Sequence, residues 1–224
     1  MTLRFKFKKY GTVIYTGHLD VMRFFQKVIR RSGIDAAYTE GYSPHLKLSF
    51  AQPLSVGVET DGDYFDLEMN SLPNMNKIVS LMNDQCVEGF EIVSATVLND
   101  GVQNGMSSVK AAVYLYEYEG GLSDNKIIDE FFSLSSYVFD HEIKGEKKVR
   151  DVIADIYSCE ILDDKHLTVT VNCSSSGNLK AFVVSDALTN FGLNMKPVKY
   201  KRIDLLTDSD DGFVPLGSLG EVYD

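Results

Sequence analysis

Two short segments near the N-terminus carry the side chains best suited to chemistry. The first is GHLDVMR, with His18, Asp20 and Arg23, and the second is GYSPHLKLSF, with His45 and Lys47. Histidine exchanges protons near neutral pH, and arginine and lysine bind phosphate or carboxylate oxygens. The two segments together therefore indicate a shared site for an anionic ligand, with RNA as our first candidate. The predicted ligand-binding residues are His18, Asp20, Arg23, Tyr42, His45 and Lys47.

A catalytic alternative uses the same two histidines. With His18 and His45 as general acid and base and cations on the phosphate, the site would suit metal-independent RNA cleavage. The spacing of His18, Asp20 and His45 matches no strong zinc or iron pattern, and no Walker loop, GxSxG or GxGxxG motif occurs. We therefore predict neither a metal nor a cofactor. We expect no catalytic activity of the chain's own, with the endoribonuclease as the open alternative.

The segments around these residues have the periodicity of alternating strands and helices. A helix over residues 17–33 has apolar residues on one side, and Arg23, Lys27, Arg30 and Arg31 on the other. We interpret Arg30 and Arg31 mainly as cations that favour the last turn of this helix. Further helices and strands give the order β-α-β-β-α-β, a ferredoxin-like half. The predicted strands cover residues 3–10, 12–15, 45–51, 63–69 and 90–97, and the second helix covers 74–84.

Turn chemistry and strand periodicity suggest how His45 is presented. Gly41 permits a turn, Pro44 favours an extended residue before it, and His45 then opens a strand. Because side chains alternate along a strand, His45, Lys47 and Ser49 share one face. We expect that face to be free of helices, with His45 and Lys47 on it or at its edge, and we expect His45 to meet His18 near the start of the first helix. The basic side of the first strand should lie opposite acids of the third, with Arg4, Lys6 and Lys8 facing Asp66, Glu68 and Tyr64.

The element order recurs after a polar linker. We predict an α+β fold of two tandem ferredoxin-like (βαββαβ) halves with antiparallel sheets, over residues 1–100 and 108–206. Residues 207–224 form an acidic, loose tail, although its FVPLGSL segment could dock on the body. In the second half, Tyr114, Tyr116 and Tyr118 alternate on one strand face. Such rows can stack nucleobases, but we favour packing against the other half or a partner protein.

Composition limits the class of protein. Residues 1–50 contain nine lysines and arginines against three acids, a net charge of +6, and the whole chain carries −10, so the remainder carries −16. No apolar run reaches about 18 residues, and the N-terminus lacks the apolar core of a signal peptide, so we expect a cytoplasmic protein without membrane contact. The three cysteines, Cys86, Cys159 and Cys173, are too far apart for a disulfide framework or a CxxxCxxC iron–sulfur motif.

The N-terminal motifs resemble the bacterial radical SAM-linked protein family, a domain of unknown function found beside, or fused to, cobalamin-binding radical SAM proteins. The resemblance is specific over residues 1–70 and diffuse beyond. Matching positions are His18, Leu19, Asp20, Arg23, Arg30, Arg31, Gly41, Pro44, His45, Ser49, Phe50, Ala51, Pro53, Leu54, Gly57, Tyr64, Asp66 and Glu68. The departures from the family pattern are Gly17, Tyr42, Ser43 and Leu46.

What this resemblance implies is association with a radical SAM partner, not radical SAM chemistry in this chain. We therefore expect an accessory or substrate-binding module. The tandem plan also resembles, in fold alone, the CRISPR repeat-processing endoribonucleases, which supports the catalytic alternative. A third possibility is a domain that only binds other proteins.

Overall fold

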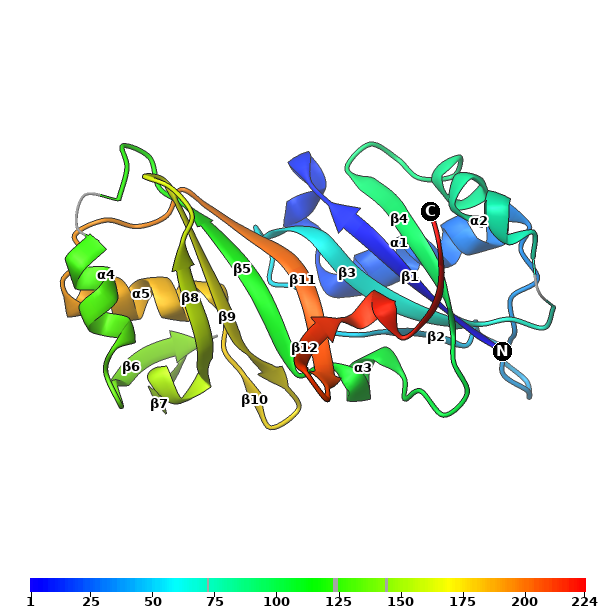
Figure 1. Cartoon of the computed structure of the whole chain (residues 1–224). Helices are drawn as coiled ribbons and strands as arrows, with labels where there is room; N and C mark the ends of the chain where they lie inside the picture. Colours follow the sequence, from blue (N-terminus) through cyan, green and yellow to red (C-terminus); the bar gives the residue numbers. More distant parts are fainter. Residues whose placement is uncertain (72, 123–124, 144) are drawn as a thin grey trace. The chain divides into compact units, whose positions relative to one another are not determined.

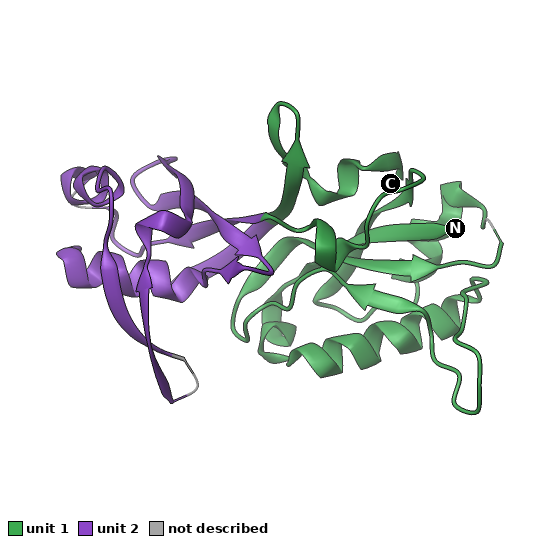
Figure 2. Ribbon diagram, turned by 90° about the horizontal axis from the view of Figure 1, so that it is seen from below, with its two compact units in different colours: residues 1–110, 204–224 green, residues 111–203 purple. Residues whose placement is uncertain are grey.

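The computed structural model describes residues 1–71, 73–122, 125–143 and 145–224. The chain divides into two compact units, shown in Figure 2: unit 1 comprises residues 1–110 and 204–224, and unit 2 comprises residues 111–203. The sequence suggested boundaries near residues 100 and 207, whereas here the C-terminal residues belong with the N-terminal ones. No helix in the described ranges is long and apolar enough to cross a membrane.

Unit 1 follows the order β-α-β-β-α-β over residues 2–98 (Figure 1). Its strands run in the order β2-β3-β1-β4, with β13 added beside β4. The elements are β1 (Thr2–Lys9), η1 (Gly11–Tyr15), α1 (His18–Ser32), β2 (Leu48–Phe50), β3 (Glu59–Glu68), α2 (Met75–Asn83), β4 (Phe90–Leu98), α3 (Gly105–Ser108), β12 (Gly212–Pro215), η3 (Leu216–Ser218) and β13 (Gly220–Tyr223).

One face of this sheet packs on α1 and α2. Leu3, Phe5 and Phe7 alternate along β1 and are fully buried in a core that includes Phe25 of α1 and Phe65 of β3. Ring centroids in this group lie 4.7 Å apart for Phe7 and Phe25 and 5.0 Å for Phe5 and Phe65. The period of two in β1 and the helical period in α1 thus point their apolar sides at each other.

The face of the sheet opposite α1 and α2 is covered by other residues of unit 1. Our expectation that this face is free is therefore wrong. β1 and β3 pair antiparallel as predicted, with Arg4 opposite Asp66 and Lys6 opposite Tyr64, but Lys8 contacts Glu91 of β4 instead. The C-terminal residues, which we expected to be loose, form β12, η3 and β13, and β13 pairs with β4. These residues pack on unit 1, which agrees with our alternative that the FVPLGSL segment docks on the body.

Two local predictions, the strand over residues 12–15 and the helix over residues 17–33, are tested in unit 1. The segment TVIY is not a strand but part of the 3₁₀ helix η1, whose last residue is Tyr15. Helix α1 begins at His18 after Gly17, which caps it without a side chain, so neither Thr16 nor His18 supplies a capping hydrogen bond. At the other end Gly33 adopts the left-handed conformation with φ 70°, as a glycine after a helix commonly does.

Unit 2 contains helices of 8 and 11 residues and a set of paired strands. Its strands run in the order β10-β9-β5-β11, and β8 also pairs antiparallel with β9. The elements are β5 (Ala111–Glu117), α4 (Asn125–Phe132), β6 (Val138–Ile143), β7 (Glu146–Asp151), η2 (Ile153–Asp155), β8 (Ile156–Ile161), β9 (His166–Ser174), β10 (Gly177–Asn178), α5 (Ala181–Phe191) and β11 (Lys199–Ser209).

The tyrosine row of β5 is core, not a docking surface. Tyr114, Tyr116 and Tyr118 are all buried, and the Tyr116 hydroxyl donates to the carbonyl of Ala181 on α5 at 3.1 Å. Tyr116 also meets Tyr200 of β11 edge to face within the same unit. Because all three are buried, the row cannot stack nucleobases. The α+β class with mostly antiparallel strands is confirmed for the chain.

A glycine substitution tests the docking of β13. A β-carbon at position 220 would overlap the backbone carbonyl of Val97 on β4. Because this is a backbone atom, the overlap cannot be relieved by the rotation of a side chain. We expect Gly220→Ala to lower the free energy of unfolding by about 1–3 kcal/mol. Amide hydrogens of residues 221–223 should also exchange faster. Gly17→Ala is the control for amide exchange only, since its β-carbon has ordinary space but alanine is a poorer helix N-cap than glycine. Unchanged exchange in Gly220→Ala would contradict the pairing of β13 with β4.

Candidate functional site

The six predicted residues lie in two places within unit 1. His18, Asp20 and Arg23 occupy the first turns of α1, whereas His45 and Lys47 precede β2. His18 lines a small cavity with Phe50 and Asp63, and His45 lines a different and larger one with Lys47. Neither of these two cavities includes both histidines. The geometry therefore gives no support to a shared His18–His45 site.

His18 is half-buried against an aromatic ring. Its imidazole meets Phe50 edge to face, with ring centroids 5.5 Å apart. Burial lowers its pKa, the Asp63 charge works in the opposite direction, and the Lys9 charge lowers it further. His18 is therefore a neutral, packed side chain at neutral pH, which suits a structural role better than a phosphate contact.

The solvent side of α1 is a cationic stripe, which we define as Arg23, Lys27 and Arg30. All three are exposed, and they follow one another at four and three residues, close to one helical turn each. Arg23 forms an exposed ion pair with Asp20 at 3.0 Å. No ion pair is found for Lys27 or Arg30 in the part of the chain that the structure describes. Arg31 is exposed beside the stripe.

A cavity of about 520 Å³ lies at the edge of the sheet where β2 meets β3. This is a size typical of small-molecule sites. His45, Lys47 and Ser49, which we predicted to share one face of a strand, all line this cavity. The lining residues are Met1, Thr2, His45, Leu46, Lys47, Leu48, Ser49, Asp66, Glu68, Leu98, Asn99, Asp100, Gly101, Val102 and Asn104.

The charges of this cavity do not favour an anion. Lys47 donates to Glu68 at 2.8 Å, and that contact raises the pKa of Lys47 and occupies its charge. Asp66 and Glu68 line the cavity, but each is already paired with a cation, Arg4 and Lys47 respectively, and Asp100 adds a further carboxylate. The lysine of the cavity is therefore not free to bind a phosphate.

His45 and Tyr42 sit on the exposed loop beside this cavity. The Nδ1 atom of His45 lies 3.1 Å from Thr39 Oγ1 and 3.4 Å from the Ser43 carbonyl oxygen. Because that carbonyl can only accept, it favours the tautomer with the proton on Nδ1. Tyr42 is fully exposed. His45 is thus held by its own loop, and no described contact joins it to His18.

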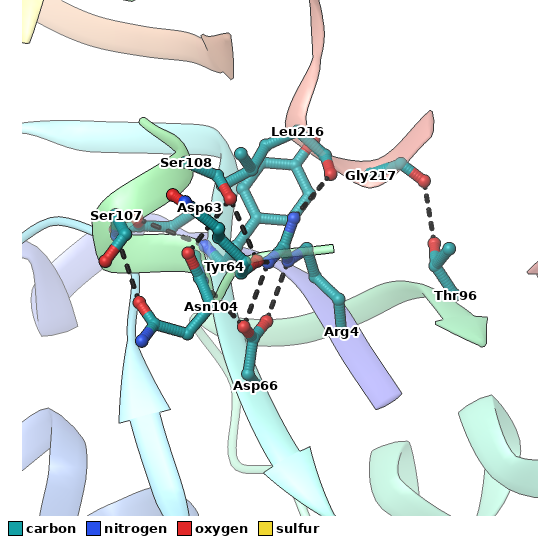
Figure 3. A network of polar contacts seen from close by, with 12 residues as sticks. Arg4, Asp63, Tyr64, Asp66, Thr96, Asn104, Ser107, Ser108, Leu216 and Gly217 are labelled. Atoms are coloured by element: carbon teal, nitrogen blue, oxygen red, sulfur yellow. Dashed lines mark hydrogen bonds and ion pairs between the residues drawn. The ribbon is translucent and has the colours of Figure 1, made fainter. Parts of the chain in front are cut away.

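A buried polar network, shown in Figure 3, includes Asp66, which also lines the cavity. Arg4, fully buried, donates from Nε and Nη2 to the two oxygens of Asp66 at 2.7 and 2.9 Å. Its remaining donors reach the carbonyls of Leu216 at 3.1 Å and Gln103 at 3.1 Å. Asp66 also accepts from the backbone amide of Gly105 at 2.7 Å. The network links β1, β3, α3 and η3.

Neither metal nor thiol chemistry is indicated. Among the described residues, no three histidine, cysteine, aspartate or glutamate side chains come together as a metal site. Burial raises the pKa of Cys86 to about 11 and that of Cys159 to about 12. Both cysteines are therefore protonated at neutral pH and poor nucleophiles.

Sequence reasoning underrated two features of unit 1. It assigned Arg30 and Arg31 to helix electrostatics, although the spacing of Arg23, Lys27 and Arg30 at about one turn was visible in the sequence. It also predicted the facing of Arg4 and Asp66 but not their burial, because the contacts of Arg4 with Gln103 and Leu216 span 99 and 212 residues of the chain.

Comparisons with known proteins show a family without a stated activity. A family model described as an uncharacterized protein conserved in bacteria (DUF2344) matches residues 2–181. A search of curated proteins finds no match. A chain in the crystal structure of a Cbf5-Nop10-Gar1 complex is similar at 12% identity with a TM-score of 0.47. The match covers 90% of this chain and 49% of that chain, so this chain spans about half its length.

Removal of Arg4 tests the buried network. Arg4→Met keeps most of the side-chain volume but leaves Asp66 buried without its partner, so we expect a loss of about 3–5 kcal/mol in the free energy of unfolding. Chemical denaturation measures it. The double variant Arg4→Met with Asp66→Leu should recover much of this loss, because no charge is then left buried. Equal stability of Arg4→Met and wild type would show that the fold does not depend on the ion pair of Arg4 with Asp66.

The pH dependence of stability tests the environment of His18. Since the pKa of folded His18 is lowered from 6.5, the unfolded chain binds more protons below that pH, and stability should fall as pH falls from about 6.5. His18→Phe removes this group and should flatten the profile in that window. Urea unfolding at a series of pH values measures both. A variant that retains the full wild-type slope would show that His18 is not its source.

Proposed function

We propose that this chain, which belongs to the bacterial family of that model, is an accessory module that binds RNA through the cationic stripe of α1. The single observation that carries the proposal is the stripe itself: three exposed cations at one-turn spacing on one helix face. Phosphates attract such cations regardless of sequence, and released counterions supply much of the binding free energy. The proposed site for the anionic ligand thus still includes Arg23. It lies on the solvent side of α1 and no longer at the two histidines.

The charge distribution elsewhere favours this placement. The large cavity presents more carboxylates than cations, and Lys47 there is paired with Glu68. The chain carries −10 overall, so RNA is repelled from most of its surface. Binding would then be local to α1 and strongly dependent on salt.

Two finer statements belong to the same proposal. The accessory role beside a radical SAM protein is supported by the motif resemblance over residues 1–70. A ferredoxin-like interpretation of both units is supported by their strand orders, β2-β3-β1-β4 in unit 1 and β8-β9-β5-β11 in unit 2. The endoribonuclease alternative has weaker support, because His18 and His45 line different cavities and the pKa of His18 is lowered by burial.

Salt-dependent RNA binding is the direct test. Fluorescence anisotropy of labelled tRNA at several salt concentrations gives the slope of log affinity against log salt. Each phosphate contact contributes roughly 0.7–0.9 to that slope. We therefore expect the double variant Lys27→Ala with Arg30→Ala to weaken binding and to reduce the slope by about 1.4–1.8.

Lys47→Ala is the matched control within the same unit. It removes one positive charge, against two in the stripe variant, and that charge comes from a lysine that is paired with Glu68 beside the cavity. We expect its slope to equal that of the wild type. A loss of binding in Lys47→Ala that exceeds the loss in the stripe variant would place the site at the cavity, and absence of binding at low salt would refute the RNA proposal.

A further inference from the structure

Five exposed apolar side chains, which we call the apolar patch, lie on segments that adjoin the beginning of α1. Two of its side chains are large and open to solvent: Tyr15 is 72% exposed and Leu19 is 64% exposed. Isolated exposed apolar residues are ordinary, but several from neighbouring segments are more informative. The patch consists of Tyr10, Tyr15, Leu19, Val56 and Val87.

Backbone hydrogen bonds bring the segments of this patch together. The amide of Gly57 donates to the carbonyl of Ile14 at 3.0 Å, so the segment with Val56 lies beside η1. The amide of Tyr10 donates to the carbonyl of Gly89 at 2.9 Å, which places the turn after Val87 beside the start of η1. The patch is thus formed by three chain segments around one short helix, and its position is set by the backbone.

One residue of the patch, Leu19, lies on the same side of α1 as the cationic stripe. Leu19, Arg23, Lys27 and Arg30 follow at four, four and three residues, so they lie on one side of α1. At a rise of 1.5 Å per residue, Leu19 and Arg30 are about 16 Å apart along the helix axis. An elongated ligand lying along α1 would therefore meet cations over most of its length and apolar rings at one end.

A single nucleic-acid strand offers both kinds of group at once. Its phosphates are regularly spaced anions, and its unpaired bases are flat, largely apolar faces that stack on aromatic side chains. A duplex has the same phosphates, but its bases are stacked on each other and are not open to a surface tyrosine. An acidic protein segment would match the stripe and would not need an aromatic ring at its end.

We infer that the RNA bound by α1 is single-stranded, with an unpaired base stacked on Tyr15 and the adjoining phosphates on Arg23, Lys27 and Arg30. This inference rests on the proposed function and adds the strandedness of the substrate and a residue for base contact. Tyr15 provides the stacking surface, while Leu19 and the valines of the patch exclude water around it.

The experiment compares two RNA probes with the full chain. One is an unstructured oligonucleotide of roughly 12 nucleotides, within the usual site size, and the other is a duplex of equal length. Anisotropy titrations at several salt concentrations use wild type, Tyr15→Ala, Tyr15→Phe, and Tyr157→Ala as a control for an exposed tyrosine of unit 2. Thermal unfolding confirms that each variant is folded.

We expect the wild type to prefer the single strand. Tyr15→Ala should weaken single-strand binding roughly 5- to 100-fold with little change in salt slope, because it removes a stacked base and no phosphate contact. Tyr15→Phe should retain binding, since the ring remains, and Tyr157→Ala should bind as wild type. Duplex binding should be nearly insensitive to Tyr15.

Each failure has a separate meaning. Equal wild-type affinity for both probes, or unchanged single-strand binding in Tyr15→Ala, overturns the stacking inference. The proposed function still holds in that case if Lys27→Ala with Arg30→Ala lowers the salt slope. No salt-dependent binding of either probe by the wild type overturns both, and the patch and stripe would then be a surface for an acidic protein partner.

Discussion

The buried ion pair of Arg4 and Asp66 is the interaction on which the rest of unit 1 depends. A guanidinium group without solvent contact costs several kcal/mol to desolvate, and only a full set of acceptors offsets that cost. Asp66 supplies two acceptors, and the carbonyls of Gln103 and Leu216 supply the others. The face of the sheet opposite the helices is therefore stable only when α3 and η3 are both in place.

This network also determines the chemistry available at the nearby cavity. Asp66 fixes the loop before α3 through the amide of Gly105, and residues of that loop form one wall of the cavity. The cations of this region are used internally, Arg4 by Asp66 and Lys47 by Glu68. The carboxylate of Asp100 also lines the cavity. The positive charge that the N-terminal segment contributes to solvent is consequently concentrated on α1.

Helix α1 combines a folding role and a binding role on its two sides. Val21, Phe25, Val28 and Ile29 are buried and hold the helix on the sheet. Because the core fixes the rotation of the helix, the cations on the other side are presented to solvent in a defined line. A rigid element of this kind holds its contacts at lower entropic cost than a loop such as the one that carries Tyr42.

The sequence by itself determined the local features of this protein. Alternation in β1, the helical period of α1, the stop at Gly33 and the facing of Arg4 and Asp66 all follow from short-range periodicity and charge, and each is present in the structure. The α+β class follows from the same patterns. The six candidate site residues were chosen from residue type alone, and proximity in sequence could not show that His18 and His45 line different cavities.

Only the tertiary structure decided which polar groups are buried and which remain open to solvent. Arg4 is buried by residues 103 and 216, and Tyr116 is buried under α5, both through contacts that are distant in sequence. Burial depends on what covers a residue, and a local pattern carries no record of a covering segment far along the chain. For the same reason, Lys27 and Arg30 of α1 joined Arg23 as candidates for binding only when the structure showed that nothing described covers them.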